Sequence, residues 1–247
     1  MSIFSVKNWL VFVVCCFCML AQSAQAQKAP DNLYYVLREA AKSKSKTAKP
    51  PVLIFLHGYG SNEEDLFSFA SQIPKNWLVL ALRAPIGLGE DTYAWYKLDF
   101  SNGKKVADTE QAEKSRLQLI NFLENLPKKH TYNPKEVYLC GFSQGGIMSY
   151  SVALTRPDLV KGAAIMSGRL LDEVKPLVKT SPELKKVRFF ISHGDADKMI
   201  EAQAAKDAEA FLKKYDLVPT LKMYKAGHEI NPTMFKDLLN FLNGKPL

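Results

Sequence analysis

A serine, an aspartate and a histidine in the second half of the chain have the types and the order that acyl transfer requires. Ser143 lies in Gly141-Phe142-Ser143-Gln144-Gly145, a G-x-S-x-G pattern between an apolar run and a helical segment. Such a turn lifts a serine hydroxyl above the edge of a sheet, where a base can remove its proton. The pattern predicts that Ser143 is a nucleophile; an ordinary glycine-rich connection is the structural alternative.

The acid and the base of such a serine follow it in the chain, on loops after later strands. Of the four histidines, only His228 lies beyond the candidate acids, between the last predicted strand and the last predicted helix. Asp195 and Asp197 both follow a buried strand. We favour Asp197, because a carboxylate directly after Gly194 is placed to bind the N–H groups of its own turn. The sequence leaves open whether Asp195 shares or replaces that role.

An oxyanion that forms during acyl transfer needs N–H donors aimed at it. Gln144 follows the serine and begins a helix, so its backbone N–H is one candidate. The loop after the apolar run at 52–56 places Tyr59 between two glycines, and its N–H is the second. His57, at the start of this loop, is expected to stabilise the turn and to take no part in the chemistry.

A long loop over residues 84–108 is rich in aromatic residues. We expect Trp95 and Tyr96 in this loop to line an acyl or aromatic pocket. The alternative, to which we give equal weight, is that these rings only pack the loop onto the body of the protein.

The elements that must position these residues alternate along the chain. Short apolar runs predict strands, and segments with helical periodicity lie between most of them. This alternation predicts an α/β fold with a mostly parallel central sheet and helices on both of its faces. The predicted strands are 33–38, 52–56, 78–82, 137–140, 163–166, 187–192 and 220–224, and the predicted helices begin at 62, 109, 147, 199 and 233.

The first 26 residues have the pattern of an export signal. Lys7 is followed by an apolar core at 9–20 and by Ala24-Gln25-Ala26, a small-x-small cleavage site. We expect cleavage before Gln27, a single domain over 27–247, and a periplasmic or secreted protein. The alternative is an uncleaved membrane anchor, which the shortness of the apolar core disfavours. Three of the four cysteines leave with the signal, so no internal disulfide is expected.

The chain carries a formal charge of +8, but its lysines are scattered and not interleaved with aromatics, so nucleic acid is not an expected partner. The lysine-rich stretch at 42–49 is interpreted as a solvated hairpin tip between two strands. His228-Glu229 begins like a zinc-protease motif, but Pro232 occupies the place of the second histidine. We expect no metal and no cofactor, and no stable membrane insertion after cleavage of the signal.

From Val52 onward the chain resembles the phospholipase/carboxylesterase family of α/β-hydrolases, which includes the acyl-protein thioesterases. The resemblance implies an α/β-hydrolase fold, Ser143 as nucleophile, Asp197 as acid, His228 as base, and the N–H groups of Tyr59 and Gln144 as oxyanion hole. One departure is Glu201, which stands where the family usually has proline after the acid. The motifs are Leu56-His57-Gly58-Tyr59-Gly60, Arg83-Ala84-Pro85, Ala94-Trp95-Tyr96, Gly141-Phe142-Ser143-Gln144-Gly145-Gly146, Ser167-Gly168, His193-Gly194-Asp195-Ala196-Asp197 and Gly227-His228.

These features together predict an exported serine carboxylesterase that hydrolyses small, short-acyl or aryl esters and has no separate lid domain. The acyl-protein thioesterases work inside cells, so an exported location argues against protein depalmitoylation. A polysaccharide deacetylase, a feruloyl esterase or a peptidase is possible on the same fold, and so is a non-catalytic binding protein. The sequence contains no signal for the oligomeric state.

Overall fold

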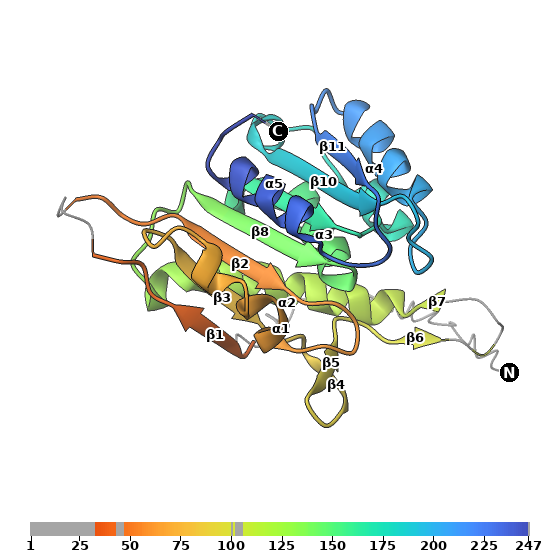
Figure 1. Cartoon of the computed structure of the whole chain (residues 1–247), viewed down its shortest axis with the longest axis horizontal. Helices are drawn as coiled ribbons and strands as arrows, with labels where there is room; N and C mark the ends of the chain where they lie inside the picture. The colour runs from red at the N-terminus through yellow and green to blue at the C-terminus, as the bar shows by residue number, and fades with distance from the viewer. Residues whose placement is uncertain (1–32, 43–46, 100, 102–105, 247) are drawn as a thin grey trace, which may run out of the picture.

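Seven strands form the central sheet, in the order β1-β3-β2-β8-β9-β10-β11 (Figure 1). The computed structural model describes residues 33–42, 47–99, 101 and 106–246. β1 is antiparallel to β3, and every other neighbouring pair in this sheet is parallel, which confirms the mostly parallel sheet. The strands are β1 (Tyr35–Arg38), β2 (Val52–Leu56), β3 (Leu78–Leu82), β8 (Val137–Phe142), β9 (Gly162–Met166), β10 (Arg188–Gly194) and β11 (Thr220–Tyr224).

The alternation of side chains along each strand divides the core into two layers. In β2, Ile54 and Leu56 belong to one buried cluster, whereas Leu53 and Phe55 belong to the other. Successive side chains of a strand point to opposite faces, so a strand in which every residue is apolar must be covered on both sides. All five residues of β2 are buried, as this requires.

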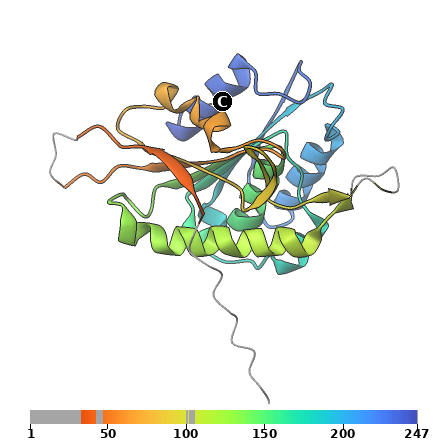
Figure 2. The same cartoon turned by 90° about the horizontal axis from the view of Figure 1, so that it is seen from below.

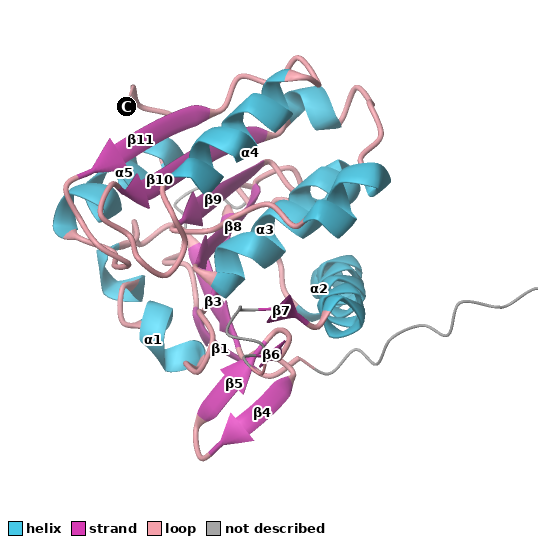
Figure 3. Cartoon of the chain, turned by 90° about the vertical axis from the view of Figure 1, so that its right-hand side faces the viewer, coloured by secondary structure: helices cyan, strands magenta, loops and turns pink. Residues whose placement is uncertain are grey.

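Five α-helices cover the two faces of the sheet. Residues of α2 (Thr109–Lys129), α3 (Gln144–Thr155) and α4 (Gln203–Lys213) contribute to the first cluster, and residues of α1 (Glu63–Phe67) and α5 (Pro232–Leu242) to the second. Figure 3 shows the two groups on opposite sides of the sheet. α2 lies beside α3 and runs across the molecule (Figure 2). The arrangement confirms the predicted fold class.

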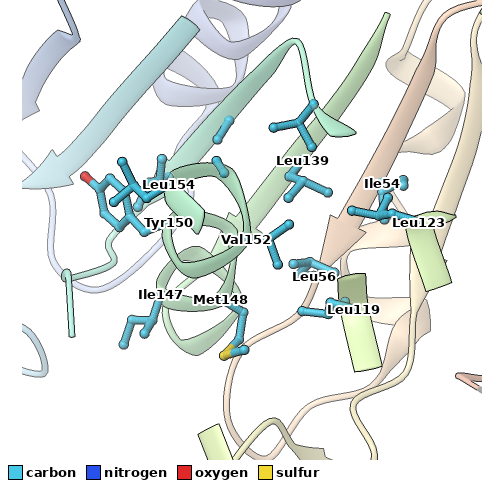
Figure 4. Close-up of a cluster of buried hydrophobic side chains, with 14 of the residues drawn as sticks. Ile54, Leu56, Leu119, Leu123, Leu139, Ile147, Met148, Tyr150, Val152 and Leu154 are labelled. Atoms are coloured by element: carbon cyan, nitrogen blue, oxygen red, sulfur yellow. The ribbon is translucent and has the colours of Figure 1, made fainter. Parts of the chain in front are cut away.

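The helix that follows the candidate nucleophile is the most deeply buried. All residues of α3 except Thr155 are buried, and its side chains meet those of β2, β8 and α2 (Figure 4). Ile147, Val152 and Leu154 are among the residues in this contact. A helix that is apolar on every side can be stable only inside the protein. Because α3 is packed on all sides, its N-terminus, which directly follows Ser143, is fixed relative to the sheet.

Three helices begin at side-chain caps that the sequence carries. Asn62 accepts a hydrogen bond from the N–H of Glu64 at the start of α1, and Asp108 accepts from Gln111 at the start of α2. Asn231 accepts from Met234 at the start of α5. Such caps satisfy N–H groups that have no partner within the helix.

The segments outside the main sheet differ most from the predictions. The 84–108 loop contains two small hairpins, β4 (Ile86–Gly89) with β5 (Thr92–Ala94) and β6 (Leu98–Asp99) with β7 (Val106–Ala107). Short 3-10 helices connect other elements, at Ala70–Gln72, Pro157–Leu159, Asp172–Leu177 and Leu184–Lys186. The interpretation of 42–49 as a hairpin tip is wrong, because β1 and β2 each pair with β3 and not with each other. Residues 43–46 of that stretch lie outside the described residues.

The predicted export signal at 1–26 also lies outside the described residues, so it stays a prediction, and so does the domain boundary at 27. Among the helices that the structure describes, none has the length and the apolar character to cross a bilayer.

Candidate active site

Ser143 lies at a strained turn between β8 and α3. Its φ of 53° and ψ of −117° are unusual for a residue with a side chain. On either side of Ser143 the backbone passes so close to neighbouring backbone that there is no room for a side chain. A Cβ on Gly141 would lie 2.1 Å from the carbonyl oxygen of Gly145, and a Cβ on Gly145 would lie 1.8 Å from that of Leu56. Both glycines are therefore required by the packing of β8, α3 and β2.

Ser143, His228 and Asp197 form a continuous chain of hydrogen bonds. His228 Nε2 lies 2.9 Å from Ser143 Oγ, and His228 Nδ1 lies 2.7 Å from Asp197 Oδ2. A carboxylate oxygen can only accept, so the proton of the neutral ring is on Nδ1 and Nε2 is free to accept from the serine hydroxyl. The ring of Phe142 packs against the imidazole, with 4.9 Å between the ring centroids. The structure thus brings together three residues that are up to 85 positions apart in sequence.

Of the two candidate aspartates, Asp197 contacts His228, and Asp195 is exposed. Asp197 Oδ1 also accepts hydrogen bonds from the backbone N–H groups of Met199 at 2.8 Å and Ile200 at 3.0 Å. Burial raises the pKa of the Asp197 carboxyl, but the bonds from His228 and the two N–H groups outweigh burial and hold that pKa below its usual value. The carboxylate is therefore ionised at neutral pH.

The bonds of Asp197 also explain why the helix expected from 199 begins later, at Gln203. Met199 and Ile200 direct their N–H groups at the carboxylate instead of into a helix. His193 Nε2 donates to the carbonyl oxygen of Ile200 at 2.8 Å, which closes the loop on its other side. His193 Nε2 also lies 3.3 Å from Asp197 Oδ2, a contact that sequence reasoning missed.

Two backbone N–H groups at the site have no acceptor among the described residues. They belong to Tyr59 and Gln144, the pair expected to form an oxyanion hole. His57 Nδ1 lies 2.7 Å from the carbonyl oxygen of Gly58, and the N–H of Ala84 donates to His57 Nε2 at 3.0 Å. His57 therefore carries its proton on Nδ1 and donates it to Gly58.

The bond from His57 sets the direction of the Tyr59 N–H. In a trans peptide the C=O and N–H groups point in opposite directions, so holding the carbonyl of Gly58 toward His57 turns the N–H of Tyr59 away from it. Burial lowers the pKa of the His57 imidazole, which keeps the ring neutral. His57 is buried, so its place in the turn agrees with the supporting role expected for it.

Trp95 is placed differently from the prediction. Its side chain is fully buried in the core and is not among the residues that line the cavity next to Ser143. Its indole Nε1 donates to the carbonyl oxygen of His57 at 3.0 Å. The prediction that Trp95 lines a substrate pocket is therefore wrong, because the indole N–H finds its acceptor inside the protein. Tyr96, by contrast, does line the cavity.

The side chain of Gln144 binds the backbone of Trp95 and Tyr96, a contact that sequence reasoning missed. Its Oε1 accepts from the N–H of Trp95 at 2.8 Å, and its Nε2 donates to the carbonyl oxygen of Tyr96 at 2.7 Å. The hydroxyl of Ser115 donates to the carbonyl oxygen of Trp95. Through these bonds the segment at residues 95–96 contacts both Gln144 and the loop that carries Tyr59.

An ion pair between Arg83 and Glu63 lies next to the bond between Ala84 and His57. Arg83 donates to the two carboxylate oxygens of Glu63, which is almost fully buried. The guanidinium carbon lies 4.4 Å from the ring centroid of Tyr34 and 4.5 Å from that of Tyr93. Arg83 is followed by Ala84, whose N–H binds His57. This bidentate and stacked geometry is specific to arginine.

A cavity of about 600 Å³ opens beside Ser143. Its wall is mostly apolar, and its charged members are Asp65, Arg169 and Glu201. A cavity of this size accommodates a small ligand. The lining residues are Gly58, Tyr59, Ser61, Asp65, Tyr96, Leu98, Phe142, Ser143, Gln144, Ile147, Arg169, Met199, Ile200, Glu201, Ala204 and His228.

Comparison with known proteins agrees with this geometry. A model of the phospholipase/carboxylesterase family matches residues 38–245. The chain belongs to this family. The match includes every strand of the central sheet except most of β1, and all of the residues that line the cavity beside Ser143.

Relatives of this family member carry names of ester hydrolases. It is 28% identical over 203 residues to a probable carboxylesterase SOBER1-like protein of Arabidopsis thaliana, which covers 77% of each chain. It is also 28% identical to acyl-protein thioesterase 1 of Kluyveromyces lactis, over 81% of this chain and 94% of the relative. The crystal structure of esterase PE8 shares the fold, with a TM-score of 0.73 and 23% identity over 87% of this chain and 99% of that one. The family member is thus a hydrolase of the carboxylesterase and thioesterase type.

Proposed function

We propose that this family member is an exported serine carboxylesterase that hydrolyses small carboxylic esters through Ser143, His228 and Asp197. The observation that carries the proposal is the unbroken chain from Asp197 through His228 to Ser143, at 2.7 and 2.9 Å. A nucleophile, a base within hydrogen-bond distance and a group that orients the base are the parts that covalent acyl transfer needs.

The reaction follows from the positions of these groups. His228 Nε2 takes the proton from Ser143 Oγ as the oxygen attacks the ester carbonyl, and Asp197 stabilises the charged imidazole. The N–H groups of Tyr59 and Gln144 bind the oxyanion that forms. His228 then returns the proton to the leaving alcohol, and water activated by the same histidine hydrolyses the acyl-serine.

The preference for small esters is supported by the cavity. Its volume of about 600 Å³ and its apolar wall fit a short acyl or aryl group. Tyr96 and Ile147 supply part of that wall. The described elements between the strands are helices, loops and two short hairpins, with no lid domain among them.

The proposal of export rests on the N-terminal sequence. The positive residue, the apolar core at 9–20 and the small-x-small site at 24–26 favour cleavage before Gln27 and a periplasmic or secreted protein. N-terminal sequencing of the protein from the source cell is expected to begin at Gln27. A mature protein that begins at Met1 would contradict this part of the proposal.

The test of the activity combines a fluorophosphonate probe with a series of nitrophenyl esters from acetyl to decanoyl. We expect labelling at Ser143, fastest turnover of short chains, and loss of both labelling and turnover in Ser143→Ala. A folded wild-type protein that neither labels nor turns over any ester would contradict the proposal and favour a binding protein. Feruloylated sugars, acetylated polysaccharides and short peptides in the same assay would separate the other hydrolase alternatives.

A further inference from the structure

The catalytic cavity contains a cation that the reaction described above does not use. Arg169 follows β9 in the Ser167-Gly168 turn and lines the cavity together with Ser143 and His228. Its guanidinium makes no hydrogen bond and no ion pair with any residue that the structure describes. The side chain is half-buried, so much of the hydration of the guanidinium has been removed without a protein partner in return.

Arg169 and Tyr96 both line this cavity. Burial raises the pKa of the Tyr96 phenol to about 12, and the charge of Arg169 acts against this rise. The phenol belongs to a side chain that is 1% exposed. The charges of Arg169 and Glu173 act on this phenol in opposite senses, and Glu173 is exposed, so water screens its charge more than that of the half-buried Arg169.

The acidic residues that share a cavity lining with Arg169 are all exposed: Asp65 and Glu201 in the catalytic cavity, and Asp172 and Asp207 in a second cavity that Arg169 also lines. Asp65 accepts a hydrogen bond from Ser61 at 2.8 Å. Asp172, on the other side of Arg169, is bound by Lys175 at 2.5 Å. Water screens these exposed carboxylates more than it screens the half-buried guanidinium of Arg169.

We propose that Arg169 is an anion-binding subsite of the catalytic cavity, and that the esters turned over best carry a carboxylate on the acyl or the alcohol side. A guanidinium binds a carboxylate with two parallel hydrogen bonds, which fixes the ester in one orientation. The proposal rests on the proposed esterase function and adds the chemical class of the substrate.

The test compares charged and neutral esters of the same shape. For the acyl side the pair is nitrophenyl hydrogen glutarate and nitrophenyl 5-methylhexanoate, in which an isopropyl group replaces the carboxylate. For the alcohol side the pair is 4-acetoxybenzoate and 4-isopropylphenyl acetate. The quantity measured is the ratio of kcat/KM for the charged ester to that for the neutral one, in wild type and variants. Intrinsic reactivity cancels when this ratio is compared between enzymes.

Arg169→Met removes the charge and keeps most of the apolar stem. We expect the charged-to-neutral ratio to fall about tenfold for one of the two pairs, mainly through KM, and Arg169→Lys to restore part of it. Whichever pair responds identifies the side of the ester that carries the anion. Lys206→Met, which removes the same charge from an exposed position on α4 outside the cavity lining, is the control and should leave the ratio unchanged.

An equal ratio in wild type and Arg169→Met for both pairs would overturn the proposal, and so would an equal fall in Lys206→Met. Turnover of the neutral esters by wild type, and its loss in Ser143→Ala, measures the esterase function separately. The anion subsite can therefore fail while the esterase function stands.

Discussion

Two loops bring groups to Ser143, and they differ in whether the group brought to the site also holds the loop in place. The oxyanion loop, residues 57–61, is bound by residues of another segment, at 93–95. Trp95 Nε1 binds the carbonyl oxygen of His57 at 3.0 Å, and the N–H of Gly60 donates to the carbonyl oxygen of Tyr93 at 2.9 Å. In the acid loop, residues 195–202, the candidate acid itself binds backbone, because Asp197 accepts from the N–H groups of Met199 and Ile200, and outside groups bind the loop as well: the N–H of Asp195 donates to the carbonyl oxygen of Tyr224.

The two loops also differ in exposure. Trp95, which supports the oxyanion loop, is fully buried, whereas Met199 at the surface of the acid loop is 57% exposed. In the proposed mechanism, the N–H groups that bind the oxyanion are separate from the side chains that position them. In the acid loop, the Asp197 carboxylate would both orient His228 and hold its own loop. Substitutions should therefore separate positioning from chemistry in the first loop and not in the second.

The largest effect is expected from Asp197→Asn. The amide oxygen can still accept from Met199 and Ile200, but the amide nitrogen then faces His228 Nδ1 and favours the wrong tautomer. We expect kcat to fall by a factor on the order of 10⁴. Circular dichroism and thermal melting would show whether the variant keeps its fold and its stability. A loss below about tenfold in a folded variant would mean that Asp197 does not orient the base.

The next effect is expected from Gln144→Leu, which keeps the backbone N–H and removes the amide that binds residues 95–96. The N–H of Trp95 and the carbonyl of Tyr96 would then be buried without partners, each at a cost of about 1–3 kcal/mol. We expect kcat to fall between about tenfold and a hundredfold, with a smaller change in KM. Gln144→Glu keeps only the acceptor for Trp95 and should lie between wild type and Gln144→Leu. An effect confined to KM would contradict a positioning role.

A smaller effect is expected from Trp95→Phe. The change removes the bond to His57 and leaves most of the buried ring area in place. One lost hydrogen bond of about 1 kcal/mol corresponds to a fall of several-fold in kcat if it positions the Tyr59 N–H. KM for aryl and alkyl esters should not change, because Trp95 does not line the cavity. A selective rise in KM for aryl esters would instead indicate contact with substrate.

The smallest effect on activity is expected outside both loops, at Asp237 in α5. Asp237 accepts from Lys222 at 3.0 Å and from Tyr224 at 2.8 Å. Burial raises the pKa of the Asp237 carboxyl, but these bonds outweigh burial and hold that pKa below its usual value. We expect Asp237→Asn to lower the free energy of unfolding by about 1–3 kcal/mol at neutral pH and to leave kcat/KM unchanged.

The pH dependence gives Asp237→Asn a second test. A carboxyl with a depressed pKa stabilises the fold above its unfolded pKa of about 3.9, and this contribution is lost as the pH falls through the folded value. The difference in unfolding free energy between wild type and Asp237→Asn should therefore shrink below about pH 4. Denaturant titrations across this range measure it. A difference that grows toward low pH would contradict the assigned pKa direction.

Much of the fold was predictable because the strands are continuous apolar runs. Residues 52–56 and 78–82 were predicted with the bounds that the structure has. The errors lie where a particular side chain or a third strand decides the local structure. α4 starts at Gln203, and not at 199, because the carboxylate of Asp197 binds the N–H groups of Met199 and Ile200. The chain between β1 and β2 is not a hairpin, because β3 lies between them.

The sequence by itself determined the alternation of strands and helices, the turn at Ser143 and the order of serine, aspartate and histidine. The alternation follows from the spacing of apolar residues along the chain. The turn follows from the glycines on either side of Ser143, and the order of the three residues is read directly from their types. Only the tertiary structure decided that Asp197 and not Asp195 contacts His228, and that Trp95 supports the oxyanion loop. A hydrogen bond between residues dozens of positions apart depends on how the layers of the sheet and helices pack, and spacing along the chain does not specify that.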